Sequence, residues 1–210
     1  MIKKNWKILL ITSIAILLPI VAGLILWNKL PQQVPFHWNA TGDVDGWAGK
    51  PFAVFGMPAI MLGFHWLCVL ATSADPKKTG HTPKMVSLVL WIIPVLNALL
   101  SAMVYAVALG QSIRVEIVMP VIMGLLLTIV GNYLPKCKQN YTIGIKIPWT
   151  LNSEENWNKT HRFAGWVWTF GGLGIMVTGF FGIFWIPLSL LLPMVLLPMI
   201  YSYILHRKGI

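Results

Sequence analysis

The sequence predicts an all-α, polytopic membrane protein with six transmembrane helices, on the strength of its composition and its long apolar runs. Hydrophobic residues make up 57% of the 210-residue chain, charged residues make up 10%, and the mean hydropathy is +0.72. A soluble domain usually has about 25% charged residues, so an ordinary globular domain is excluded. A helix crosses a bilayer core roughly 30 Å thick with about 20 apolar residues, which leaves room for about six spans.

Six apolar runs have the length of a span. They cover residues 8–27, 51–72, 85–109, 117–134, 163–184 and 186–205. The first run follows three lysines, as in a signal peptide, but it is long enough to span and no small-residue cleavage site follows it, so we interpret it as a retained helix. We expect one structural unit, with two spans each in residues 1–72, 73–134 and 135–210.

Basic residues predict the orientation. With the N-terminus inside, thirteen of them lie in inner segments and three in outer ones. The inner ones are Lys3, Lys4, Lys7, Lys77, Lys78, Lys84, Lys136, Lys138, Lys146, Lys159, Arg162, Arg207 and Lys208, and the outer ones are Lys29, Lys50 and Arg114. Cytoplasmic loops retain Lys and Arg, so both termini are predicted to be cytoplasmic. The net charge of +10 then reflects topology and anionic lipid rather than direct nucleic-acid binding.

Polar and small residues inside the spans are candidates for contacts between helices. His65 and Asn97 lie within spans, and Asn132 lies near the inner end of the fourth. Each could line a ligand cavity or make one interhelical hydrogen bond. In the fifth span, small residues recur every four positions at 174, 178 and 182, which predicts a close-packed helix face. The partner helix belongs either to this chain or to a second copy in a homo-oligomer.

The outer loop, residues 30–50, reads "LPQQVPFHWNATGDVDGWAGK" and predicts a folded surface motif rich in turns. Its candidate ligand-binding residues are His37, Trp38, Asp43, Asp45, Trp47 and Lys50. Imidazole and carboxylates are metal ligands, but this spacing matches no metal motif, and turn capping explains the two aspartates equally well. We assign no metal site and no cofactor.

The inner segment, residues 135–162, is the longest polar stretch. Residues 141–150 are expected to be extended, whereas Ser153 predicts a helix N-cap that leads through acidic residues into the fifth span. Glu155 should pair with Lys159. The segment is either an interfacial anchor, in which Trp149, Trp157 and Trp166 form a belt, or a docking surface or cavity mouth. Its candidate residues are Asn132, Asn140, Trp149, Thr150, Trp157 and His161.

Both segments together resemble the SdpI family, the membrane immunity proteins against sporulation-delaying-protein toxins of Gram-positive bacteria. The outer loop resembles the domain of unknown function DUF1648 that opens many members, at Pro31, Pro35, His37, Trp38, Gly42, Asp45, Gly46 and Lys50. The inner segment is similar to the second hallmark at Gly131, Asn132, Asn140, Gly144, Pro148, Trp149, Thr150, Leu151, Trp157, His161 and Gly165.

This resemblance implies a multi-pass protein of the bacterial cell membrane that gives resistance to an extracellular peptide toxin. It further implies that the occupied protein holds a cytoplasmic autorepressor at the membrane. Membrane lipids, a peptide toxin or other envelope ligand, and a repressor are thus the expected partners. Signal transfer would need a two-state rearrangement of the helices.

Two other functions stay open. A membrane enzyme acting on lipid or peptide would use His37, Asp43 and Asp45, or His161 with Glu154 and Glu155, yet the sequence has neither G-x-S-x-G nor H-E-x-x-H. We therefore assign no catalytic residue. A small transporter would use His65 and Asn97, but acidic residues for proton coupling are missing from the spans.

Overall fold

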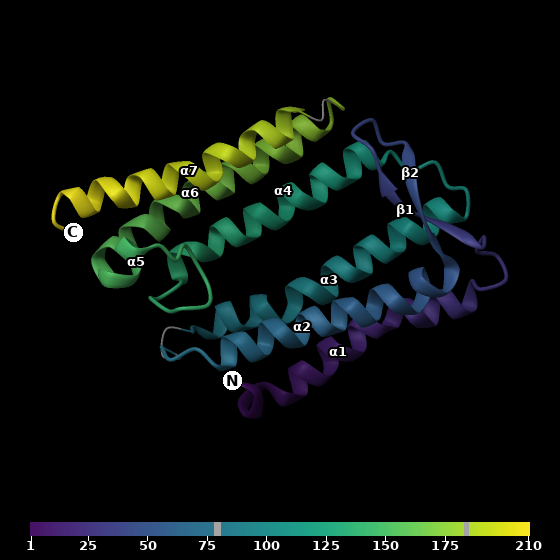
Figure 1. Ribbon diagram of the computed structural model, residues 1–210, viewed down its shortest axis with the longest axis horizontal. Coiled ribbons are helices and arrows are strands. Elements are labelled where there is room, and N and C mark those ends of the chain that lie inside the picture. The colour runs from purple at the N-terminus through teal and green to yellow at the C-terminus, as the bar shows by residue number, and fades with distance from the viewer. Residues whose placement is uncertain (78–80, 183–184) are drawn as a thin grey trace. The chain divides into compact units, whose positions relative to one another are not determined.

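The computed structural model describes residues 1–77, 81–182 and 185–210, which form long helices and one β-hairpin (Figure 1). Lys78 and the end of the fifth predicted span, at 183–184, lie outside the described residues. The elements are α1 (Ile2–Ile25), β1 (Gln33–Trp38), β2 (Val44–Gly49), η1 (Phe52–Gly56), α2 (Met57–Ser73), α3 (Pro83–Ala108), α4 (Val115–Tyr133), η3 (Leu134–Lys136), α5 (Pro148–Asn152), α6 (Glu154–Gly179) and α7 (Trp185–Arg207).

The prediction of an all-α membrane protein is confirmed, since five described helices are long and apolar enough to span. They are Ile2–Ile25, Phe52–Ser73, Pro83–Ala108, Val115–Lys136 and Trp185–Arg207. The fifth predicted span lies in α6, which is not among them. On its exposed face, Arg162 is followed by Trp166 and Phe170, which are 62% and 63% exposed. Six spans and cytoplasmic termini stay predictions.

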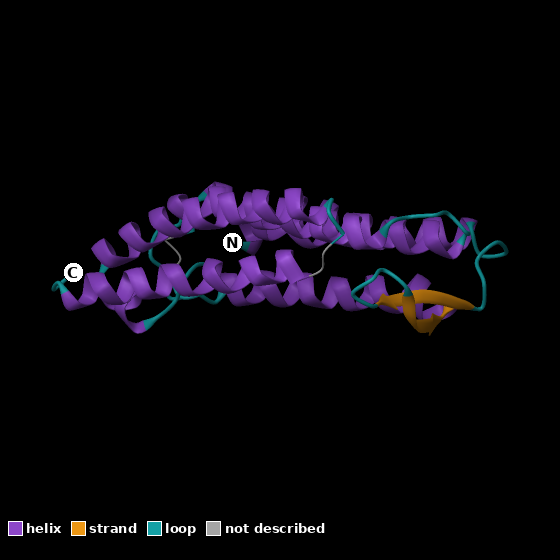
Figure 2. Ribbon diagram, turned by 90° about the horizontal axis from the view of Figure 1, so that it is seen from above, coloured by secondary structure: helices purple, strands orange, loops and turns teal. Residues whose placement is uncertain are grey.

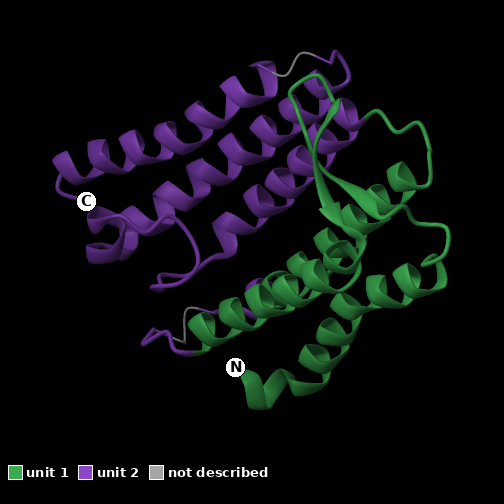
Figure 3. Ribbon diagram, turned by 45° about the vertical axis from the view of Figure 1, so that its right-hand side comes forward, with its two compact units in different colours: residues 1–73, 86–114 green, residues 74–85, 115–210 purple. Residues whose placement is uncertain are grey.

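The chain divides into two compact units (Figure 3). Unit 1 comprises residues 1–73 and 86–114, and unit 2 comprises residues 74–85 and 115–210. The connection between α2 and α3 thus belongs to unit 2, although all of α2 and most of α3 belong to unit 1.

Unit 1 contains α1, α2 and most of α3, together with the hairpin, whose two strands are orange in Figure 2. Two buried clusters form its core. One is Leu9, Val69 and Leu90, and the other is Leu30, Val54 and Tyr105. Each cluster draws on α1 or the residues just after it, on the η1–α2 stretch and on α3, so apolar packing joins the three elements.

An antiparallel hairpin occupies most of the predicted outer loop. Gln33 pairs with Gly49, and Trp38 pairs with Val44, with irregular register around His37. The turn follows from Asn39, whose side-chain oxygen accepts hydrogen bonds from the amides of Thr41 and Asp43. The folded surface motif was therefore predicted, but its strands were missed, although apolar residues alternate through "VPFHW".

Unit 2 is held together by close contact between α4 and α6. A Cβ atom on Gly131 would lie 2.6 Å from the amide nitrogen of Thr169, and one on Gly172 would lie 2.6 Å from the carbonyl oxygen of Gly124. The face of α6 that packs against α4 therefore runs through Gly172. Of the predicted positions, Gly174 packs against α7, where a Cβ would lie 3.3 Å from Leu190, whereas Gly182 has open space.

The inner segment folds differently from the prediction in its first half. Pro148, Trp149 and Thr150 begin the short helix α5 instead of ending an extended stretch, because proline suits the first position of a helix. The second half is confirmed. Ser153 caps α6 by accepting from the amide of Asn156 at 3.1 Å, and Glu155 pairs with Lys159 at 2.7 Å.

Candidate functional site

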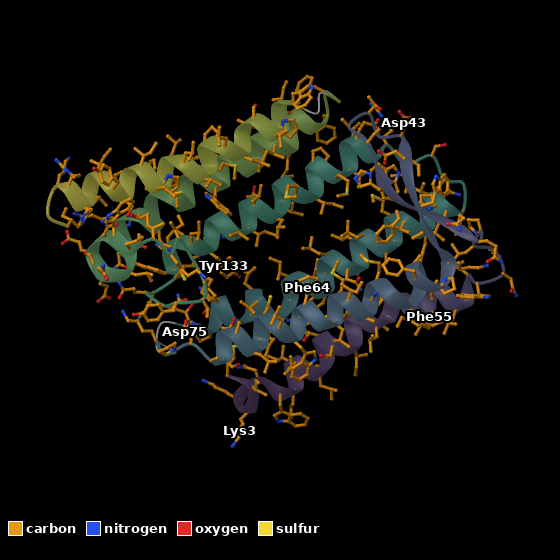
Figure 4. All side chains as sticks on the ribbon, viewed as in Figure 1. Lys3, Asp43, Phe55, Phe64, Asp75 and Tyr133 are labelled. Carbon is orange, nitrogen blue, oxygen red and sulfur yellow. The ribbon has the colours of Figure 1, made fainter. Side chains whose placement is uncertain are left out.

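The hairpin presents most of the predicted outer residues to solvent. His37 pairs with Asp45 across the strands, and their side chains are 73% and 45% exposed. Trp47 is exposed and Trp38 is half-buried. Asp43 lies at the turn of the hairpin (Figure 4), where its carboxylate accepts a hydrogen bond from the Thr41 hydroxyl at 2.7 Å. Four polar or aromatic side chains are therefore available to a ligand on one small motif.

Lys50 stands apart from these residues because it is buried. Its ammonium donates to the carbonyl oxygens of Trp27 at 3.1 Å and Leu30 at 3.0 Å, and it lies 5.0 Å from the centre of the Trp27 ring. These carbonyls follow the end of α1, so the charge also meets the negative end of the helix dipole. Lys50 thus ties the end of β2 to the end of α1 and positions the hairpin.

The two polar residues predicted inside the spans each bridge to α1. Nε2 of His65 lies 3.1 Å from the Thr12 hydroxyl, and Nδ1 has no hydrogen-bond partner among the described residues. Asn97 donates to the carbonyl of Ile16 at 2.8 Å. Thr12 and Ile16 are one helical turn apart, so His65 and Asn97 hold α2 and α3 to the same face of α1. Interhelical hydrogen bonding, one of the two predicted roles, describes both residues.

Unit 1 also contains two hollows. A groove of about 340 Å³ lies between α1 and α3 and is lined by apolar and small residues, including Pro19, Pro94 and Ala98. A small cavity of about 30 Å³ lies beside Asn97, Phe36 and Met61. The larger groove carries almost no polar surface to orient a substrate.

Asn140 is the centre of the inner segment. It is fully buried, and its amide nitrogen donates to the carbonyls of Lys138 at 2.8 Å and Ile143 at 2.9 Å. Its oxygen accepts from the amides of Thr142 at 2.9 Å and Ile143 at 2.7 Å. A single side chain thus fixes a tight loop, which satisfies backbone groups that helices or strands would otherwise pair.

Thr150 performs a similar task at the beginning of α5. Its hydroxyl lies 2.7 Å from the carbonyl of Ile145 and accepts from the amide of Ile147 at 3.1 Å, which caps the beginning of α5. Trp149 lies against α7, with ring centres 5.1 Å from Tyr203 and 5.9 Å from His206. Thr150 therefore shapes α5, and Trp149 attaches it to the end of α7.

Trp157 and His161 form the buried floor beneath this loop. Their rings stack with centres 4.0 Å apart, and the indole nitrogen of Trp157 donates to the carbonyl of Cys137 at 2.7 Å. His161 accepts the amide of Ile145 on Nε2 at 2.9 Å and donates from Nδ1 to the carbonyl of Trp157. Burial lowers the pKa of His161 to about 4, against the opposing effect of that carbonyl.

These contacts determine which side chains of the inner segment are buried and which are exposed. Trp157 is fully buried in the protein, so it cannot act as the lipid-facing anchor that one prediction gave it. Asn140, Thr150 and His161 are buried as well. We call residues 137–161 the platform, because these signature side chains build its interior. Asn132 is not part of it and lies exposed on α4, where its side-chain oxygen is 3.4 Å from Lys136 Nζ.

The outer surface of the platform and its neighbours is basic. Exposed cationic side chains are Lys136, Lys138, Lys146, Lys159, Arg162, Arg207 and Lys208, and the exposed acids are Glu154 and Glu155. Lys159 is engaged by Glu155. A rigid surface with excess positive charge suits an acidic protein surface or anionic lipid headgroups.

Asp75 is the functional candidate that the sequence analysis missed. Its side chain is fully buried and accepts hydrogen bonds from the amide of Tyr141 at 2.9 Å and the hydroxyl of Thr142 at 2.8 Å. The amide of Lys77 and Nε2 of His81 also donate to it, at 2.8 Å and 3.1 Å. Figure 4 shows Asp75 at the Tyr133 end of α4.

Burial alone would raise the pKa of the Asp75 carboxyl, but hydrogen bonds from Thr142, the Lys77 and Tyr141 amides, and His81 lower it below its ordinary value. The sequence held one signal for this role. Asp75 is the only acid in the connection between the second and third predicted spans, which otherwise carries lysines. An isolated acid in a basic loop predicts a specific partner.

Among residues 1–77, 81–182 and 185–210, no group of three or more His, Cys, Asp and Glu side chains could hold a metal ion. Asp75, His81 and Thr142 do not form a nucleophilic triad, because one nitrogen, Nε2, lies 3.1 Å from both of the other side chains.

Comparison with known proteins confirms the predicted resemblance. Residues 136–203 match the SdpI/YfhL protein family, and residues 14–62 match the domain of unknown function DUF1648. Over 212 aligned residues the chain is 28% identical to Immunity protein SdpI of Bacillus subtilis (strain 168), covering 98% of this chain and 97% of that protein. No solved structure matches the chain.

Proposed function

We propose that this chain, a homologue in the SdpI/YfhL protein family, protects a bacterial cell against a peptide toxin that reaches it from outside. The observation that carries the proposal is the similarity to an immunity protein along nearly the whole chain, which includes the hairpin, the helices and the platform. The protein is a multi-pass membrane protein, and the toxin resistance, its ligand and the repressor are the proposed parts.

The hairpin is the proposed contact for the peptide. His37, Asp45 and Trp47 are exposed on it, and Trp38 is half-buried beside them. Aromatic rings beside polar groups are the usual composition of a peptide contact. Lys50 holds the hairpin to α1, which favours a preformed site that loses little entropy on binding.

The platform is the proposed contact for a cytoplasmic repressor. Asn140, Thr150 and His161 hold its interior together by hydrogen bonds, so its basic side chains lie on an ordered surface. Its lysines would attract an acidic face of the repressor, since a basic DNA-binding face would be repelled.

Survival of a toxin-sensitive bacterium tests the first role. Cells expressing this protein would be challenged with the sporulation-delaying-protein peptide, beside cells expressing Trp47→Ala and His37→Ala variants. We expect protection from the wild type and at least tenfold lower survival with the variants. Gln33→Ala is the matched control, because Gln33 is an exposed strand residue of the same hairpin outside the proposed contact.

The second role requires a variant of the platform. Trp149→Ala removes the ring that joins α5 to Tyr203 and His206, and Thr150→Ala removes the hydroxyl at the beginning of α5. A double variant that inserts normally should no longer hold the repressor at the membrane when peptide is present. Unchanged survival and unchanged retention of the repressor in this variant would contradict a role for the platform. Death of the cells that express the wild-type protein would contradict the immunity function itself.

A further inference from the structure

The connection between α2 and α3 is attached to the platform at two points. Asp75, two residues after the end of α2, accepts the amide of Tyr141 and the hydroxyl of Thr142. Met85, near the beginning of α3, is 2% exposed and packs in a buried cluster with Cys137 and Trp157. Each helix therefore enters unit 2 through a residue that the platform holds.

The first point of attachment is more specific than packing. Lys77 strengthens it, because its ammonium donates to the side chain of Gln139 at 2.7 Å and lies 5.3 Å from the centre of the Tyr141 ring. Gln139 in turn donates to the carbonyls of Thr150 and Leu151 at 2.8 Å and 3.0 Å. A continuous set of hydrogen bonds thus runs from the end of α2 to α5.

We propose that Asp75 is a positioning residue through which a change in α2 and α3 reaches the platform, so that a ligand at the hairpin alters what the platform binds. This proposal rests on the proposed function for its ligands. Its physical basis does not, because chain continuity keeps Asp75 two residues from the end of α2 in any arrangement of the two units.

The chemistry of the carboxylate explains why this contact responds to small movements. Oδ2 of Asp75 accepts from three donors, namely Tyr141, Thr142 and His81, so one atom joins the end of α2 to the platform loop. An ionised, buried acceptor whose donors leave is costly, and the loop 140–143 should therefore move with Asp75 rather than separate from it. Two discrete arrangements are what allosteric coupling requires.

A double-mutant cycle on purified protein in lipid nanodiscs tests this without any ligand. Thr12→Val removes the hydroxyl that His65 contacts in unit 1, and amide hydrogen exchange is measured at Tyr141, Thr142 and Ile143. We expect exchange at these amides to change by about threefold or more in Thr12→Val. In an Asp75→Asn background, Thr12→Val should have no further effect, because the connection is already broken.

Lys84→Gln is the matched control, since it removes one charge from the same connection at an exposed residue. In this background the effect of Thr12→Val should persist. Unchanged exchange in Thr12→Val, or an equal effect of Thr12→Val with Asp75→Asn, would overturn the proposal. The cycle also identifies a merely structural role, because replacing a merely structural Asp75 would raise exchange at 140–143 and still leave the response to Thr12→Val intact.

A second experiment, in cells, distinguishes failure of this proposal from failure of the proposed function. Cells expressing Asp75→Asn should survive the peptide within about twofold of cells expressing the wild type. The amount of repressor that they hold at the membrane when peptide is present should be at least tenfold lower. Equal retention would overturn the coupling role. If wild-type cells show no protection, the proposed function fails, and the exchange cycle alone decides whether Asp75 couples the helices to the platform.

Discussion

The backbone amide of Ile145 donates to Nε2 of His161 at 2.9 Å, which fixes the ring as the neutral tautomer with its proton on Nδ1. The ring is 1% exposed and stacks on Trp157. A protonated ring would present a second N–H to the Ile145 amide, so one hydrogen bond would be lost and a buried charge would be gained.

Stability should therefore fall as the pH is lowered. The pKa of His161 is lowered from 6.5 to about 4 in the folded protein. Between these values the unfolded chain binds a proton that the folded protein does not, so the contribution of His161 is complete above pH 6.5 and decreases toward pH 4. The slope is about 1.4 kcal/mol per pH unit.

Thermal unfolding in detergent at about pH 7 and about pH 5 measures this effect. His161→Gln should have a smaller difference in melting temperature between the two pH values than the wild type, because the titrating ring is gone. His37→Gln is the control, since its ring is exposed on the hairpin. Equal pH dependence in wild type and His161→Gln would contradict the assignment.

Gly144→Ala should destabilise the platform through the same ring. Gly144 has a φ of +121°, and a Cβ there would collide with Nε2 of His161 and lie 3.1 Å from the Trp157 ring. Backbone strain and overpacking together should lower the free energy of unfolding by about 3 kcal/mol. Gly110→Ala separates the two causes, because Gly110 has a φ of +84° but open space around it, so we expect a loss of only about 1 kcal/mol.

The melting temperatures of both variants, measured in the same detergent, check this prediction. Equal losses in Gly144→Ala and Gly110→Ala would mean that strain acts alone and that His161 can move aside.

Sequence reasoning predicted the helices well because each one is determined locally. A span needs only a long apolar run, so five of the six predicted runs fall in helices that can cross a membrane. The helix cap at Ser153 and the pair of Glu155 with Lys159 are also confirmed, since they depend on residues within four positions of each other.

The site was harder to predict because its contacts are distant in sequence. Asp75 meets Tyr141 sixty-six residues away, and His65 meets Thr12 fifty-three residues away, so no local pattern reveals either pair. The polar composition of 140–162 was interpreted as a surface, yet Asn140, Thr150 and His161 point inward. A loop without regular structure must satisfy its backbone with side chains, which consumes the polar residues that a surface would display.

Lys50→Met should loosen the hairpin. The substitution keeps most of the side-chain volume but leaves the carbonyls of Trp27 and Leu30 without their donor. Hydrogen bonds from a charged group contribute about 1.5 to 3 kcal/mol, so amides of β1 and β2 should exchange at least tenfold faster. Lys29→Met is the control, because Lys29 is exposed beside the same turn. Equal exchange in both variants would show that the strands hold without this cation.

Cys137 should report on the integrity of the platform. Its thiol is buried, and burial raises its pKa to about 11, against the opposing effect of the Asn140 amide. The reactive thiolate is then about one part in a thousand at about pH 8.

In a Cys68→Ser background, Cys137 should react with maleimide at least 100-fold more slowly in the folded protein than in denaturant, as mass spectrometry would measure. Gly144→Ala should increase the rate, because it disturbs the floor that covers the thiol. Equal labelling of the folded and denatured protein would mean that the platform opens freely and that its contacts cannot hold one docking surface.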